Sequence, residues 1–402
     1  MKHCLAYLTL ALLAFASTAT LSAVTIEIDY SLDTDNFFDT PEKRAALEAA
    51  ADLYADLLDD DLLEIDPNTF DSPVPVSWTA IVRHPTTNAE HEIDNLVVPA
   101  DTIIVFAGAR PIPGSTLGTG GPGGFSASGL QSWFDRIRGR GNPGAIATPR
   151  TDFAPWGGSV SFDSDASWNF SLEGNGPGRE FVSIALHELG HVLGIGTADV
   201  WQVLTSTNVF TGPAANQSLG ASPDAFNGHL QNPAGGTLES PLFGSFAALH
   251  GTERPALMLP SLTDTGSNFD VATDLDLSVL FDLGWEVTPR TSLEATALSP
   301  DAAAFTWPST SFIDYQLERA TDLASFDTVV TQTAGDGFAQ AAADPAPPAG
   351  RAFYRLRSQN NLASATSQSG GGLGAAGGAV GDEPRTIRVD PVIVECQDMH
   401  PE

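Results

Sequence analysis

The feature that most constrains this chain is the stretch FVSIALHELGHVLGIGT, residues 181–197. Its first part predicts an apolar helix that begins near Glu180 and ends near Gly194. Within that helix His187 and His191 are four residues apart, so both side chains lie on one face. Two imidazoles placed in this way can bind a single metal ion, and the simplest alternative is a core helix that carries two incidental histidines.

The residue between them suggests chemistry rather than structure. Glu188 lies one step round the helix, where it reaches a water bound to the ion rather than the ion itself. Zinc lowers the pKa of such a water towards neutrality, and a carboxylate can then take its proton. We therefore predict one catalytic Zn²⁺ held in part by His187 and His191, with a zinc-bound water activated by Glu188 as general base.

Several motifs carry a family resemblance. HELGHVLGIG resembles the metzincin clan of zinc metallopeptidases, in which the chain leaves the helix at the glycine, here Gly194, to deliver a third histidine. GGSVSFDSDASWNF is similar to the strand before the active helix in matrixins. ALMLPSL resembles the methionine turn, with Met258 as the floor under the zinc, and LDLSVLFDLGW resembles the helix that closes such domains. The resemblance implies a metzincin-type domain over residues 24–287.

The third zinc ligand is the main departure from the family. In matrixins a histidine follows the glycine by three residues, but here that position is Thr197, whose hydroxyl would have to ionise to bind zinc. Asp199 is suitable chemically but two residues out of register. A long insertion at this point is what leishmanolysin-like metzincins have. We predict His250, because it lies eight residues before Met258, with His229 as the alternative.

Two other readings of the site stay open. A non-catalytic adhesion or surface-binding protein could keep a metzincin frame without activity, although the intact Glu188 argues against it. An enzyme of another zinc peptidase clan could instead use a downstream carboxylate, Glu239 or Asp224, as its third ligand.

Further metal sites are less clearly indicated. Ser161 occupies the place of a histidine that helps bind a structural zinc in matrixins, so we expect no second zinc. Asp152, Asp163 and Asp165 could bind a structural Ca²⁺ through carboxylate oxygens. The alternative is that these aspartates cap turns around a strand.

Composition and the N-terminus bear on location and partners. The net charge of −32 argues against nucleic acid as a partner, because phosphate binding needs a basic surface. Residues 1–23 have the charged, apolar and small-residue order of a secretory signal peptide, and the apolar run is too short to span a bilayer. Without that segment Cys396 is the one cysteine, which excludes an intramolecular disulfide. Control of the activity through Cys396 in the tail stays open. We predict a secreted, extracellular monomer without a membrane span.

The chain divides into regions of different pattern. Strand and helix signals alternate ahead of the active helix, including a helix that begins at Pro41 with Thr40 as N-cap, which predicts an α+β fold with a mixed twisted sheet. Residues 288–358 carry short alternating runs and predict a small all-β sandwich that resembles fibronectin-type modules. Residues 359–402 predict a Gly-rich linker and a disordered tail.

The resulting hypothesis is a secreted zinc-dependent endopeptidase that hydrolyses peptide bonds of extracellular proteins. Its partners would be protein or peptide substrates. We expect an edge strand of the N-terminal sheet, the one carrying GGSVSF, to pair with the extended backbone of the substrate.

Overall fold

The computed structural model describes residues 24–172, 176–233, 238–242, 253–260, 272–288, 293–298, 302–321, 325–326, 328–348, 352–361 and 385–397. The predicted signal peptide, residues 1–23, lies outside the described residues, and so does His250. None of the helices within the described ranges is long and apolar enough to cross a membrane.

A five-stranded mixed sheet forms the centre of the molecule, in the order β1-β4-β7-β5-β23. Strands β1 (Thr25–Asp29), β4 (Thr102–Arg110) and β7 (Gly157–Asp163) are parallel. Strand β5 (Thr116–Pro122) is antiparallel to β7, and β23 (Val394–Gln397) is antiparallel to β5. The expectation that GGSVSF forms an edge strand was wrong, because this segment is β7 and lies between β4 and β5. Its unbroken burial is typical of an interior strand.

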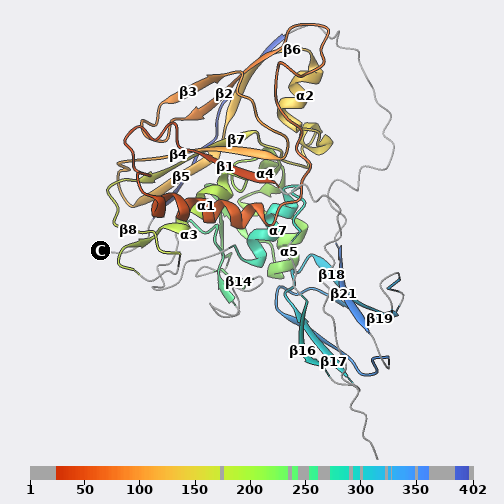
Figure 1. Cartoon of the computed structure of the whole chain (residues 1–402). Helices are drawn as coiled ribbons and strands as arrows, with labels where there is room; N and C mark the ends of the chain where they lie inside the picture. Colours follow the sequence, from red (N-terminus) through yellow and green to blue (C-terminus); the bar gives the residue numbers. More distant parts are fainter. Residues whose placement is uncertain are drawn as a thin grey trace, which may run out of the picture.

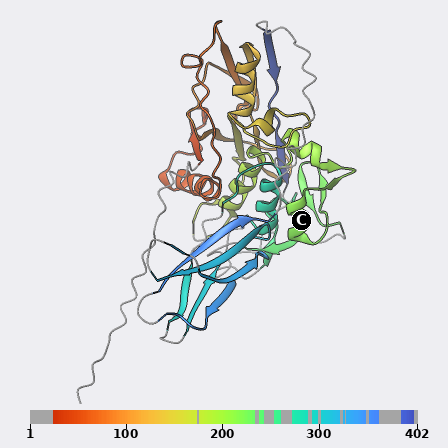
Figure 2. The same ribbon diagram turned by 90° about the vertical axis from the view of Figure 1, so that its right-hand side faces the viewer.

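A second sheet continues the first, because β6 (Gly124–Gly129) follows β5 after a single residue. Its order is β22-β6-β2-β3, and every pairing in it is antiparallel. The other members are β2 (Ser77–Arg83), β3 (Glu90–Asp94) and β22 (Arg385–Val389). Where the sequence predicted a disordered tail, β22 and β23 add to the two sheets. Figures 1 and 2 show them as violet strands next to much earlier parts of the chain.

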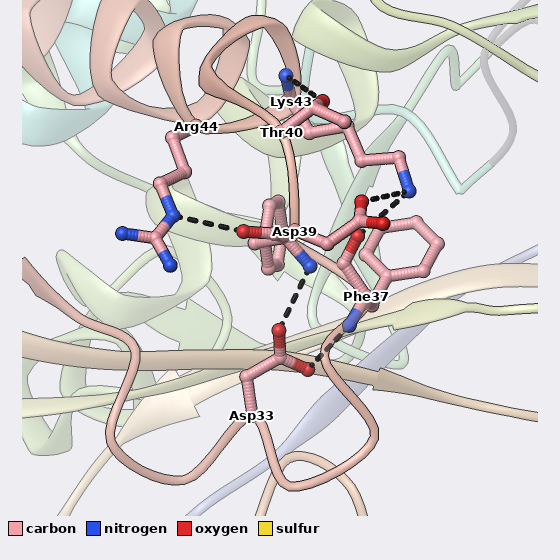
Figure 3. Close-up of polar contacts among 7 residues, drawn as sticks. Asp33, Phe37, Asp39, Thr40, Lys43 and Arg44 are labelled. Atoms are coloured by element: carbon pink, nitrogen blue, oxygen red, sulfur yellow. Dashed lines mark hydrogen bonds and ion pairs between the residues drawn. The ribbon is translucent and has the colours of Figure 1, made fainter.

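Two helices pack against the central sheet. Helix α1 (Pro41–Ala55) contacts β1 and helix α3 (Phe181–Val192) (Figure 1). It begins as predicted, since the Thr40 hydroxyl oxygen accepts a hydrogen bond from the Lys43 backbone N–H at 3.4 Å. Figure 3 shows this cap and the loop before it, in which the Asp33 carboxylate accepts from the Phe37 N–H at 3.1 Å. These short-range bonds fix the entry of the chain into α1.

The closing helix is α7 (Asp274–Asp282). Just after it, the Trp285 indole N–H donates to the Leu193 carbonyl at 2.8 Å. Leu193 is the C-cap of α3, so this bond satisfies a carbonyl that the end of the helix would otherwise leave without a partner. The residues that follow the closing helix therefore anchor the C-terminal end of α3.

Strands between residues 294 and 360 form two three-stranded antiparallel sheets. One has the order β16 (Glu294–Leu298), β17 (Ala303–Trp307) and β20 (Gln340–Asp344), and the other has the order β19 (Thr328–Ala334), β18 (Ile313–Ala320) and β21 (Phe353–Asn360). The Phe312 ring stacks on Phe281 of α7 with centroids 4.8 Å apart. The Asp274 carboxylate accepts hydrogen bonds from both the N–H and the hydroxyl of Ser311. One hydrophobic cluster thus runs from the central sheet into these strands, and the two regions share a core.

The molecule also contains α2 (Gln131–Gly139), a 3-10 turn (Pro143–Ile146), β8 (Trp168–Asn169), β9 (Arg179–Glu180), α4 (Asp199–Leu204), β10 (Thr205–Ser206), β11 (Val209–Phe210), α5 (Pro213–Leu219), β14 (Glu239–Pro241) and β15 (Glu253–Pro255).

Candidate metal centre

The active helix α3 (Phe181–Val192) is buried along its whole length. Its N-terminus is capped by Glu180, whose carboxylate accepts from the Val182 and Ser183 N–H groups at 3.3 and 2.7 Å. An anionic cap also interacts favourably with the helix dipole. The helix ends before Gly194, whose φ of +106° turns the chain in a way that side chains other than glycine disfavour.

Glycines in β5 let this helix approach the sheet at the position of Glu188. A Cβ atom added at Gly118 would lie 2.6 Å from Glu188 Oε1, and one at Gly120 would lie 2.3 Å from the Glu188 carbonyl oxygen. Any larger residue at either position would push the helix or its glutamate away. The glycines of the Gly-rich segment therefore set the place of the Glu188 carboxylate beside β5.

A hairpin brings a third histidine to α3. Strands β12 (Asp224–Phe226) and β13 (His229–Gln231) are joined by Asn227 and Gly228, with φ values of +50° and +81°. Asn-Gly with two positive φ angles is the favoured two-residue turn of a β-hairpin. His229 is the first residue after this turn.

The tip of the hairpin is fixed by backbone contact with the loop that follows α3. A Cβ atom at Gly196, which has a φ of +80°, would lie only 2.1 Å from the Gly228 carbonyl oxygen. Two glycines thus meet without side chains between them. This close approach holds His229 over the helix that carries His187 and His191.

The three imidazoles form a nearly equilateral triangle. Their Nε2 atoms are 3.1 Å apart for His187 and His191, 3.2 Å for His187 and His229, and 3.3 Å for His191 and His229. Zinc–nitrogen bonds of about 2.0 Å at tetrahedral angles would place ligand nitrogens about 3.3 Å apart. The triangle therefore has the size that a tetrahedral zinc ion requires. Among the described residues, these three histidines are the group that could hold a metal ion.

Each ring is also held in the correct tautomer. The Nδ1 atoms lie 2.8, 2.8 and 2.9 Å from the carbonyl oxygens of Leu257, Ile195 and Asn227, for His187, His191 and His229 respectively. Because a carbonyl can only accept, each Nδ1 carries the proton, and each neutral ring directs an Nε2 lone pair at the other two. Three converging lone pairs repel one another unless a cation lies between them, so the donor set fits a metal ion.

Burial favours the neutral rings. Desolvation, with a smaller contribution from the neighbouring histidines, lowers the pKa of His187 to about 3 and that of His191 well below its ordinary value. Burial lowers the pKa of His229 to about 4. The rings are therefore neutral at pH 7, with Nε2 free of a proton, as ligation to a metal requires.

A methionine turn supports the site from below. A Cβ atom at Gly190, between the two helix histidines, would lie 2.6 Å from Met258 Sδ. The Asp276 carboxylate accepts from the Leu257 and Met258 N–H groups at 2.9 and 3.1 Å. Because the Leu257 carbonyl also binds the His187 ring, this turn orients a ring of the triangle.

The structure brings together only some of the residues predicted from the sequence. His187, Glu188, His191 and Met258 lie in one region, and His229 completes a histidine triangle, whereas His250 lies outside the described residues. The Thr197 hydroxyl donates to the His191 carbonyl at 2.7 Å. It therefore caps the helix in the place where matrixins carry a histidine.

The alternative carboxylate ligands do not join this group. Asp224 lies opposite Gln231 in the strand register, at the open end of the hairpin. Glu239 lies opposite Pro255 in a separate two-stranded sheet. Neither belongs to the histidine group.

The structure does not gather the three aspartates predicted to bind calcium. Asp163 ends β7, whereas Asp152 precedes the start of that strand. The Asp163 carboxylate accepts from the Ile112 and Asp165 N–H groups at 3.0 and 3.2 Å, and Asp152 accepts from the Phe153 N–H. These contacts fit the alternative, in which the aspartates cap turns.

Comparison with known protein families gives one result. The matrixin family model matches residues 135–217. This segment runs from α2 to α5 and contains His187, Glu188 and His191, but it ends before His229. The match supports a metzincin-type zinc metallopeptidase over that part of the chain, with protein substrates implied by the family. No curated protein sequence and no solved structure matches the chain.

His229 could have been found from the sequence. The signal is the Asn-Gly pair directly before it, with Phe226 on one side and Leu230 on the other, because Asn-Gly is a strong local indication of a hairpin. The prediction of His250 depends on closeness in sequence to Met258. Closeness in sequence does not decide this site, because the Leu230 N–H already donates to the Met258 carbonyl at 2.8 Å and ties the hairpin to the methionine turn.

Proposed function

We propose that this protein is a secreted zinc-dependent endopeptidase whose metal ligands are His187, His191 and His229 and whose general base is Glu188. The observation that carries the proposal is the triangle of Nε2 atoms, 3.1–3.3 Å on a side. All three rings are oriented by backbone carbonyls, and a buried carboxylate lies on the same helix. Between the two histidines predicted as third ligand, the geometry of the described residues supports His229.

The roles follow from the chemistry of the residues. Zinc, when bound, would supply a Lewis acid for the peptide carbonyl and lower the pKa of water. Glu188 would take a proton from the attacking water and transfer it to the leaving amine nitrogen, so that it returns to the carboxylate form after each cycle. Its position against Gly118 keeps the carboxylate beside β5, the strand with which we expect an extended substrate to pair. Secretion and extracellular protein substrates are supported by the signal-like order of residues 1–23.

A pair of histidine variants tests the ligand set. His229→Ala should reduce zinc content from about one equivalent to a small fraction, measured by atomic emission after dialysis against buffered zinc. His250→Ala is the matched control and should keep its zinc. The opposite pattern would restore His250 as the ligand, and loss of zinc from Glu239→Ala would favour a carboxylate ligand.

A second experiment separates an enzyme from a zinc-binding surface protein. Glu188→Gln should keep one equivalent of zinc but lose at least about 1,000-fold in hydrolysis of casein or a fluorogenic peptide, because general base catalysis and water activation depend on it. If zinc-loaded wild type cleaves nothing, even after residues 385–397 have been removed, the adhesion-protein alternative would replace the peptidase.

A further inference from the structure

Residues 385–397, here called the strap, run alongside both sheets of the N-terminal region. Strand β22 pairs with β6 from Arg385–Gly129 to Val389–Phe125. After a short crossing, β23 pairs with β5 from Val394–Gly120 to Gln397–Thr116. Figures 1 and 2 show the strap as two violet strands beside these partners. The strap thus occupies the outer edge of β5 along most of its length.

That edge adjoins the metal centre. Gly118, the β5 residue paired with Cys396, is the one whose added Cβ would lie 2.6 Å from Glu188 Oε1. On the other side of the strap, the methyl groups of Val394 lie 3.0 and 3.2 Å from a Cβ placed at Gly228, the residue before His229. The strap also contacts α3. It therefore passes between β5 and the histidine hairpin, beside the catalytic groups.

A polypeptide substrate would need the same position. An extended peptide gains main-chain hydrogen bonds by adding to an exposed strand edge, and β5 is the strand whose edge lies next to Glu188. Two chains cannot pair with one edge. We propose that the strap is a built-in inhibitor that occupies the substrate edge of β5 and must leave before a polypeptide can bind there; this inference depends on the peptidase function proposed above.

The neighbouring strands are shaped to accept the strap. A Cβ atom at Gly121 would lie 1.8 Å from the Val392 carbonyl oxygen, and one at Gly124 would lie 2.0 Å from that of Val389. A side chain at either position would prevent the strap from approaching. The Gly-rich segment thus accommodates the helix through Gly118 and Gly120 and the strap through Gly121 and Gly124.

The strap is held mainly by strand pairing and surface contacts, and only Ile387 and Val389 of β22 pack partly against a hydrophobic cluster. Arg388 of β22 forms ion pairs with Glu90 and Glu92 of β3 at 2.7 and 3.1 Å, and these exposed pairs are screened by salt. In the crossing, Val392 is 44% exposed. The crossing also borders a cavity of about 120 Å³ shared with Trp156 and Thr197. An element held by strand pairing, exposed ion pairs and partly buried side chains can detach while the pairing between the other strands of the two sheets remains.

The test begins with the folded full-length chain. A recognition sequence for a specific protease is inserted after Gly372, the zinc-loaded protein is cut, and the released fragment is removed by gel filtration and checked by mass spectrometry. We expect kcat/KM for a fluorogenic peptide to rise about tenfold or more, because an intramolecular occupant acts at an effective concentration near millimolar. A synthetic peptide of residues 385–397 should restore inhibition and compete with substrate.

A point variant tests the same proposal if the cut fragment stays bound to the rest of the chain. Arg388→Glu in the uncut chain reverses the charge facing Glu90 and Glu92 and should raise kcat/KM, by less than removal of the strap does. Arg357→Glu, at an exposed position of β21, makes the same charge change and should have no effect. Unchanged activity after loss of the fragment, or equal activity in the two arginine variants with the fragment retained, would overturn the proposal.

A binding measurement separates this inference from the peptidase function. In the Glu188→Gln background, fluorescein-labelled peptide 385–397 should bind the cut chain and not the uncut chain, as read by anisotropy. Equal binding to both would show that the strap does not cover the edge. If the cut, zinc-loaded wild type binds the peptide in this pattern yet cleaves nothing, the strand pairing stands, and the peptidase function and the inhibitory role both fail.

Discussion

Gly118→Ala offers the sharpest test of the position assigned to Glu188. The added methyl carbon would lie 2.6 Å from Oε1, 2.8 Å from Cγ and 2.9 Å from Cδ of Glu188, whereas ordinary van der Waals contact begins at 3.4 Å. The carboxylate must therefore move by several tenths of an ångström in a site where the whole side chain is buried. A misplacement of about 1 Å in a reacting group costs about 100-fold in rate, or about 2.7 kcal/mol of transition-state stabilisation.

We expect kcat/KM of Gly118→Ala, measured on the cut chain without the strap, to fall about 100-fold while zinc stays at one equivalent. Thr119→Ala is the matched control, because neighbouring residues of a strand face opposite sides of the sheet, and it should stay within about threefold of wild type. An unchanged rate in Gly118→Ala would refute the placement of the general base. Loss of zinc would instead show that the methyl group disrupts the histidines.

The remaining predictions concern the third histidine and the metal. Gly196→Ala should weaken zinc binding about 10-fold or more in a competition titration, because its Cβ would meet the Gly228 carbonyl at 2.1 Å; Gly220→Ala has a similar φ of +70° but open space around it and should bind zinc normally. In metal-free protein, the pKa of His229 near 4 lies below its unfolded value, so the stability it contributes is present above about pH 6.5 and is lost as pH falls towards 4. Urea unfolding at pH 7 and pH 5 should therefore show wild type losing about 2 kcal/mol more than His229→Gln; an equal loss would contradict the depressed pKa. Removing zinc with a chelator should lower the melting temperature by on the order of 10 °C, since ligand at 1,000 times its Kd adds about 4 kcal/mol, and His229→Ala should show little of this shift.

Much of the centre could be predicted from the sequence because it is local. The spacing of His187 and His191 determines their common face once the segment is a helix, and the predicted helix ends agree with the observed ones within two residues. Thr40 and Pro41 likewise mark the start of α1 through bonds within one turn. Such features depend on neighbours in the chain, so sequence patterns are sufficient to predict them.

The parts that were missed depend on contacts between distant segments. The strap has the alternating pattern TIRVDPVIVE, but its strands form against β5 and β6, more than two hundred residues earlier in the chain. Short isolated strands are not stable alone, and the Gly-rich stretch before them favoured a prediction of disorder. The interior place of β7 was missed for the same reason, because local patterns do not give the order of strands in a sheet.

The stacking of Phe312 on Phe281 has a consequence for anyone who wishes to express the metal-binding region by itself. A chain cut at residue 288 would expose the rings and aliphatic side chains that the downstream strands now cover, and the product would tend to aggregate. A replacement module could be joined there only if it brought its own apolar cover for the closing helix. In engineering terms, the natural unit for exchange extends to residue 361.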